Sequence, residues 1–164
     1  MTKFLLSVHV LAAILAVGSI TVAASMFPRY ALRALGGGGD GDVEAADDRA
    51  PGIAALLHRV CRAYAVAGLA VPVFGIATAV QLDVLTDAWL IASLILTMIA
   101  AGLLALVILP RQRALLDRAA DASDPARGAR RAAARLAMLT GIFNLLWATV
   151  TVLMIVRPGS TTGA

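Results

Sequence analysis

The stretch Phe4–Phe27, FLLSVHVLAAILAVGSITVAASMF, decides the fold class of this chain. It contains no Asp, Glu, Lys or Arg, and as a helix it would extend about 36 Å. Because the hydrocarbon core of a bilayer is about 30 Å thick, an uncharged segment of this length predicts a transmembrane helix. The length, together with Arg29 after the segment, favours a retained helix over a cleaved secretory signal.

Three more uncharged stretches of this kind follow, so that spans are predicted at about 4–27, 63–80, 88–109 and 136–156. The composition agrees, since 60% of the 164 residues are hydrophobic and only 15% are charged. Soluble domains average about 45–50% apolar and about 25% charged residues. The sequence therefore predicts an all-α integral membrane four-helix bundle formed by a single domain, residues 1–164, and excludes a water-soluble enzyme.

The positive charges gather in two of the three connections between spans. Twelve of the 14 basic residues lie there: Arg29, Arg33, Arg49, Arg59, Arg62, Arg111, Arg113, Arg118, Arg127, Arg130, Arg131 and Arg135. Short basic connections stay in the cytoplasm, so both termini are expected outside. We expect a multi-pass protein of the bacterial inner (plasma) membrane, with cytoplasmic extensions of its helices and no nucleic-acid partner.

The two basic connections differ in composition. Residues 36–50 are rich in Gly and Asp and are expected to form a flexible linker. In the second connection, Asp124-Pro125 predicts the start of the fourth helix. Its basic face either contacts anionic lipid headgroups or only enforces the topology; the face consists of Arg127, Arg130, Arg131 and Arg135. Pro28-Arg29 and Pro110-Arg111 follow the first and third uncharged stretches, and this shared pattern is either a weak internal repeat or a helix-end stop used twice.

Small and polar residues mark one face of each span and predict where the helices pack. Asn144 is expected to hydrogen-bond to another helix near the bilayer centre, and Thr140 and Ser19 are predicted to lie at similar helix contacts. Pro72 has no N–H to offer the carbonyl of Gly68 and should kink the second helix there.

Two histidines are candidates for chemistry. His9 lies inside the first span, where an ionisable residue is a functional hypothesis by default; the alternative is a neutral imidazole that only packs. His58 and Cys61 are an i, i+3 pair, but two ligands make a weak metal site, so no metal is predicted there. The favoured interpretation makes His58 a polar residue at headgroup level and Cys61 a small interfacial filler. A single Cys also excludes an intrachain disulfide.

The start Phe4-Leu5-Leu6-Ser7-Val8-His9-Val10-Leu11 with Gly18, together with the end Val156-Arg157-Pro158-Gly159, resembles a bacterial family of small integral membrane proteins of unknown function. That family is similar to the copper-resistance-D-like group, which includes membrane-embedded protoporphyrinogen oxidases. The resemblance implies an inner-membrane four-helix bundle whose first-helix His binds haem b. Only His9 carries over to this chain.

Three functions stay open at this point. The first is a structural or accessory protein that associates with a membrane protein partner, or with itself, through its small-residue faces. The second is a haem b-binding redox protein with His9 as one axial ligand and Met154, at a comparable depth in the fourth span, as the other. The third is a small transporter, for which Pro72 and Asn144 are the only midplane signals.

Overall fold

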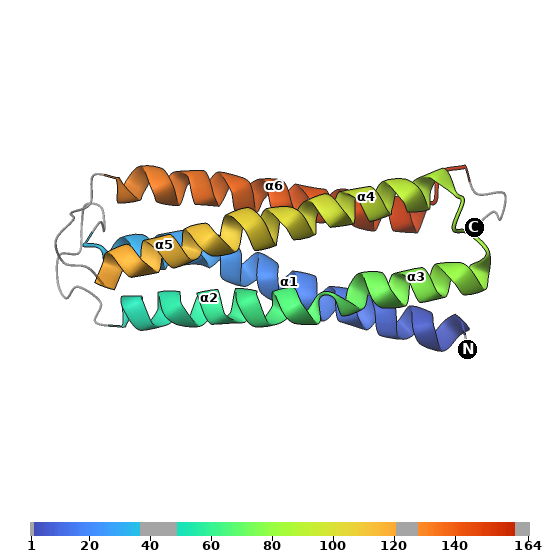
Figure 1. The fold of residues 1–164 in the computed structure, drawn as a ribbon, viewed down its shortest axis with the longest axis horizontal. Helices are drawn as coiled ribbons and strands as arrows, with labels where there is room; N and C mark the ends of the chain where they lie inside the picture. Colours follow the sequence, from blue (N-terminus) through green and yellow to red (C-terminus); the bar gives the residue numbers. More distant parts are fainter. Residues whose placement is uncertain (1, 37–48, 121–127, 160–164) are drawn as a thin grey trace.

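The computed structural model describes residues 2–36, 49–120 and 128–159, and it is helical throughout these ranges apart from short turns. Four long apolar rods run side by side (Figure 1). They are α1 (Thr2–Ala34); α2 (Ala50–Ala67) with α3 (Ala70–Leu82); α4 (Ala88–Gly102) with the π-helix η1 (Leu103–Ile108) and α5 (Leu109–Ala120); and α6 (Ala129–Val156). Each rod is long and apolar enough to cross a membrane. The predicted all-α, four-helix architecture is therefore confirmed.

Three expectations about the connections lie outside the described residues. They are most of the linker predicted at 36–50, the helix start near Pro125, and the placement of Arg127. The helix α6 is described from Ala129 onward.

Neither Pro28 nor Pro110 ends its helix, so the interpretation of the two prolines as helix-end stops is wrong. The helix α1 continues through Pro28 to Ala34, and α5 carries the third rod through Pro110 to Ala120. The reason at Pro110 lies in η1, where the hydrogen bonds reach one residue further than in an α-helix: the N–H of Leu109 donates to the carbonyl of Leu104. This wider turn shifts the pattern of backbone hydrogen bonds just before Pro110, which has no N–H to donate. The third rod therefore continues through the proline.

The second rod is interrupted where the sequence predicted a kink. The helix α2 ends at Ala67 and α3 begins at Ala70. Pro72 offers no hydrogen to the carbonyl of Gly68, and that carbonyl instead accepts the N–H of Val71 at 3.0 Å, in a tighter turn. The rod therefore changes from α2 to α3 within its apolar part.

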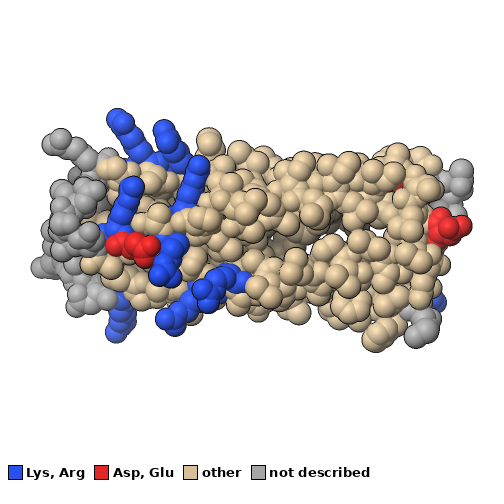
Figure 2. Space-filling model, in the orientation of Figure 1, with Lys and Arg blue, Asp and Glu red and all other residues tan. Residues whose placement is uncertain are grey.

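The bundle has two unlike ends. Thr2, Val156 and the turn at residues 83–87 lie at one end, which we call the terminal end (Figure 1). Ala34, Ala50, Ala120 and Ala129, the helix ends on either side of the two long connections, lie at the other, which we call the connection end (Figure 1). Most of the described Lys and Arg side chains gather toward the connection end, where Asp117 of α5 also lies, whereas Asp83 and Asp87 belong to the turn at the terminal end (Figure 2). This separation is the charge asymmetry expected from the sequence.

The core is closed toward the connection end and looser toward the terminal end. Fully buried Phe27, Ile108, Leu136 and Phe143 fill the space among α1, η1 and α6. Beyond the interruption at Gly68 and Leu69, α3 packs mainly on α1, while α4 packs on α6. The result is a space between these two helix pairs in the terminal half of the bundle.

Candidate functional site

A pocket of about 630 Å³ occupies the terminal half of the bundle, between α1, α3, α4 and α6. Figure 2 shows the surface hollowed in this region. Its volume lies within the range of about 300–1,000 Å³ that is typical of small-molecule sites. The walls are mainly aliphatic, and the polar residues among them are His9, Thr78, Thr97, Trp147, Thr151 and Arg157. The pocket therefore suits a largely apolar ligand that is held by a few polar groups.

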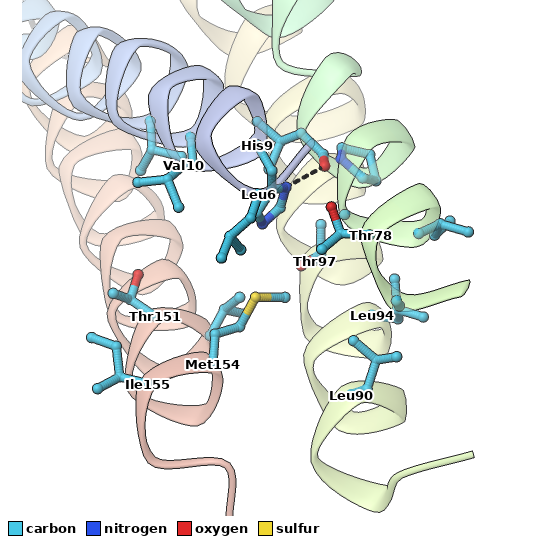
Figure 3. Close-up of a pocket in the computed structure, with 18 of the residues that line it drawn as sticks. Leu6, His9, Val10, Thr78, Leu90, Leu94, Thr97, Thr151, Met154 and Ile155 are labelled. Atoms are coloured by element: carbon cyan, nitrogen blue, oxygen red, sulfur yellow. Dashed lines mark hydrogen bonds between the residues drawn. The ribbon is translucent and has the colours of Figure 1, made fainter. Parts of the chain in front are cut away.

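His9 is the polar residue whose position is best fixed. Its imidazole is buried, and Nδ1 lies 2.8 Å from the carbonyl oxygen of Val71 (Figure 3). Because a carbonyl only accepts, Nδ1 must carry the hydrogen, and in the neutral tautomer with this hydrogen Nε2 has the lone pair that a metal ligand needs. Histidines that bind metals commonly donate their second ring N–H to a backbone carbonyl in this way, since the bond fixes the tautomer and the ring orientation.

Gly75 creates the space that the His9 ring occupies. A Cβ atom at position 75 would lie 2.9 Å from Cε1 and 3.2 Å from Nδ1 of His9, closer than ordinary van der Waals contact. Position 75 therefore accepts no side chain while the imidazole keeps its place. The neighbouring turn, with Pro72 and the Gly68 carbonyl, brings the Val71 carbonyl to the same ring.

Met154 lines the same pocket from α6, as the depth estimate from the sequence anticipated. Figure 3 shows its thioether extending into the space that His9 enters from α1. The structure thus brings the two residues proposed as axial ligands to one pocket. His58, in contrast, lies on α2 among residues of the connection half.

Three pocket residues were not singled out from the sequence. At the terminal end, the guanidinium carbon of Arg157 lies 5.5 Å from the centre of the Trp89 ring, and Trp89 Nε1 donates to Asp87 Oδ2 at 2.9 Å. Deeper in the pocket, Trp147 Nε1 is buried and has no hydrogen-bond partner among the described residues. The sequence offered a weak signal for Trp89, which follows Asp87 at the start of an apolar helix, and none for Trp147, which lies inside one.

The structure places His58 and Cys61 in the interior of the bundle. His58 is buried, and its Nδ1 lies 3.0 Å from Gln112 Oε1. Gln112, which the sequence reasoning missed, is fully buried and also donates from Nε2 to the Sγ of Cys61 at 3.7 Å. Cys61 is therefore a core residue that contacts this polar cluster. Among the described ranges, no group of three or more His, Cys, Asp and Glu is arranged to hold a metal ion.

The residues predicted at helix contacts have different surroundings. Asn144 reaches another helix, because its Nδ2 donates to Ser25 Oγ of α1 at 3.4 Å, while its buried Oδ1 lacks a partner in the described part of the chain. Thr140 is buried with an unpartnered Oγ1, and Ser19 is half-buried. Arg130, Arg131 and Arg135 are exposed near the connection end of α6.

The site is thus an apolar pocket with one imidazole oriented by a backbone carbonyl, a thioether, and an arginine at its terminal end. It lies within helices that are compatible with a membrane. No protein-family model, curated protein or solved structure matches this chain.

Proposed function

We propose that this chain is a small inner-membrane protein that binds an apolar cofactor inside the bilayer, with His9 as its anchor and haem b as the first candidate. The observation that carries the proposal is the bond between His9 Nδ1 and the Val71 carbonyl, which leaves Nε2 available at a pocket of about 630 Å³. A buried imidazole that served packing alone would not need a cavity beside it. The resemblance noted in the sequence supports the same residue.

The residues around the pocket fit haem. His9 and Met154 supply a nitrogen and a sulfur ligand of the kind found in cytochromes c. Arg157, which lies over the Trp89 ring at the terminal end of the pocket, offers a guanidinium to a carboxylate. When bound, haem would supply one-electron redox chemistry. The protein's own contribution is to orient the ligands and to surround the cofactor with apolar side chains.

The charge distribution supports the orientation in which the connection end faces the cytoplasm. Under this orientation, the pocket lies in the outer half of the membrane. The proposed protein therefore lies in the inner membrane with its connection end in the cytoplasm and its pocket in the outer half of the bilayer.

The direct test is the visible spectrum of the full chain purified in detergent from cells with ample haem. We expect a Soret band that His9→Gln and His9→Ala remove or shift, since neither side chain ligates iron as imidazole does. Met154→Leu should shift the band. His58→Ala serves as the matched control and should leave it unchanged, because His58 bonds to Gln112 in the other half of the bundle.

The two Trp residues of the chain, Trp89 and Trp147, both line the pocket and give a second measurement. Titration of the haem-free protein with haem should quench the fluorescence of these two residues, with saturation at one equivalent of haem. His9→Gln should weaken the binding of haem. Circular dichroism should confirm that each variant remains helical. A colourless protein that haem does not quench, or a spectrum indifferent to both His9 variants, would contradict the haem proposal and favour the structural or accessory role.

A further inference from the structure

A second, smaller hollow of about 190 Å³ lies near the connection end, between α5 and α6. Three arginines from two helices surround it: Arg111 and Arg118 from α5, and Arg135 from α6. Ala114, Leu115 and Ala132 complete the lining. The sequence had placed the basic face on the fourth helix alone, whereas the structure joins one of those arginines to two from the third rod.

The spacing explains why these side chains meet. Arg111, Leu115 and Arg118 follow the i, i+4, i+7 pattern of one helical face, and this face of α5 is turned toward α6. Asp117 lies outside the hollow and forms an ion pair with Arg113, whose Nε is 3.1 Å from Oδ1. The carboxylate described on this helix is thus engaged with a different arginine.

The chemistry of the hollow indicates an anion. Guanidinium groups that face one concavity repel one another, and an anion placed between them replaces this repulsion with charge-assisted hydrogen bonds. Phosphate suits such a site because several planar guanidinium groups can each donate to its oxygens. The remaining lining is apolar, formed by Ala114, Leu115 and Ala132, so a phosphate that is attached to an apolar molecule fits better than a fully hydrated ion.

We infer that the hollow formed by Arg111, Arg118 and Arg135 binds the phosphate of an anionic phospholipid at the connection end of the bundle. Basic pockets between membrane helices are suited to such headgroups. A lipid is favoured over free phosphate because the hollow combines arginines with an apolar lining and lies on rods that are apolar enough to cross a membrane. This site is independent of the His9 pocket and of its cofactor.

The test uses the full-length protein in neutral detergent, with phosphatidylglycerol adducts counted by native mass spectrometry over a lipid titration. Arg111→Gln, Arg118→Gln and Arg135→Gln should each raise the dissociation constant of the tightest adduct by roughly fivefold. Arg130→Gln and Arg131→Gln are matched controls, because they remove the same charge from equally exposed positions of α6 that do not line the hollow. These two variants should change the constant less than twofold.

Two further arms identify the source of the anion. Phosphatidylcholine, which has no net charge, should bind at least fivefold more weakly than phosphatidylglycerol. Inorganic phosphate at ten times the lipid concentration should not displace the adduct, and displacement would assign the site to a free anion instead. An equal rise of the dissociation constant in the hollow variants and in the control variants would overturn the inference, because it would show that the lipid is attracted by overall charge. Unchanged helical circular dichroism excludes unfolding as the cause of a loss.

Discussion

Replacing Gly75 with Ala tests how tightly the His9 ring is held. The added Cβ would lie 2.9 Å from His9 Cε1 and 3.2 Å from Nδ1, so either the imidazole or α3 must move. Overpacking of this kind costs about 1–3 kcal/mol. If the ring moves, the 2.8 Å bond to the Val71 carbonyl is also lost, and hydrogen bonds inside membranes average about 0.6 kcal/mol.

Gly18→Ala is the matched control, because Gly18 also lines the pocket but a Cβ there would meet nothing within 4 Å. Both substitutions gain the same helix propensity, about 0.5–1 kcal/mol, since each replaces a glycine inside a helix. The difference between the two variants therefore isolates the collision with His9. We expect Gly75→Ala to be less stable than Gly18→Ala by about 2 kcal/mol.

The assay is thermal unfolding in detergent, followed by circular dichroism. By the scaling known for soluble domains of this size, a difference of about 2 kcal/mol corresponds to about 4–8 °C in Tm. Gly75→Ala combined with His9→Ala should recover much of this loss, because the small side chain removes the collision. Equal Tm values for Gly75→Ala and Gly18→Ala would refute the reasoning that the missing side chain at position 75 leaves the room that the His9 ring needs.

Three more predictions concern the rest of the bundle. Gln112→Leu should lower the unfolding free energy by about 1–3 kcal/mol, because buried His58 loses its acceptor; Cys61→Ala keeps that bond and should cost less, and the reverse order would contradict the assigned contacts. Thr140→Val should leave stability unchanged or raised, since the hydroxyl it removes is buried without a hydrogen-bond partner among the described residues, whereas a large loss of stability would reveal a partner. For the topology, a membrane-impermeant thiol reagent applied to spheroplasts should label Thr86→Cys but not Gly52→Cys, both in a Cys61→Ala background; the opposite pattern would reverse the proposed orientation.

The architecture was predictable because the bilayer imposes it on the sequence. Four uncharged stretches of sufficient length specify four rods, and no detail of side-chain packing is needed to count them. The interruption near Gly68 was predictable for a similar reason, since Pro72 lacks a hydrogen whatever surrounds it. The similar level of His9 and Met154 was predictable from rise per residue, whereas the fact that both line one pocket also depends on how α1 and α6 are rotated.

What the sequence left open depends on how one helix is rotated against another. Gln112 follows Pro110 in a stretch with many arginines, so its complete burial was not expected, and the environment of His58 could not be predicted without it. The hollow at Arg111, Arg118 and Arg135 requires the same knowledge, because it joins two helices that are separate in the chain. Hydropathy gives the length and depth of a rod, but it contains little information about its angle of rotation.

The π-helix η1 sets the angle of rotation of α5, which continues the same rod. A π turn is equivalent to one residue inserted into an α-helix, and one residue corresponds to a rotation of about 100°. Gln112 meets His58, and Arg111 and Arg118 meet Arg135, with this extra residue in place. The polar cluster in the core and the arginine hollow at the surface thus both depend on the rotation of α5 about its own axis. A segment made only of Leu, Ala, Val and Ile fixes this rotation. Deleting one residue between 103 and 108 would preserve the hydrophobic content of the rod and still turn both groups of side chains away from their partners.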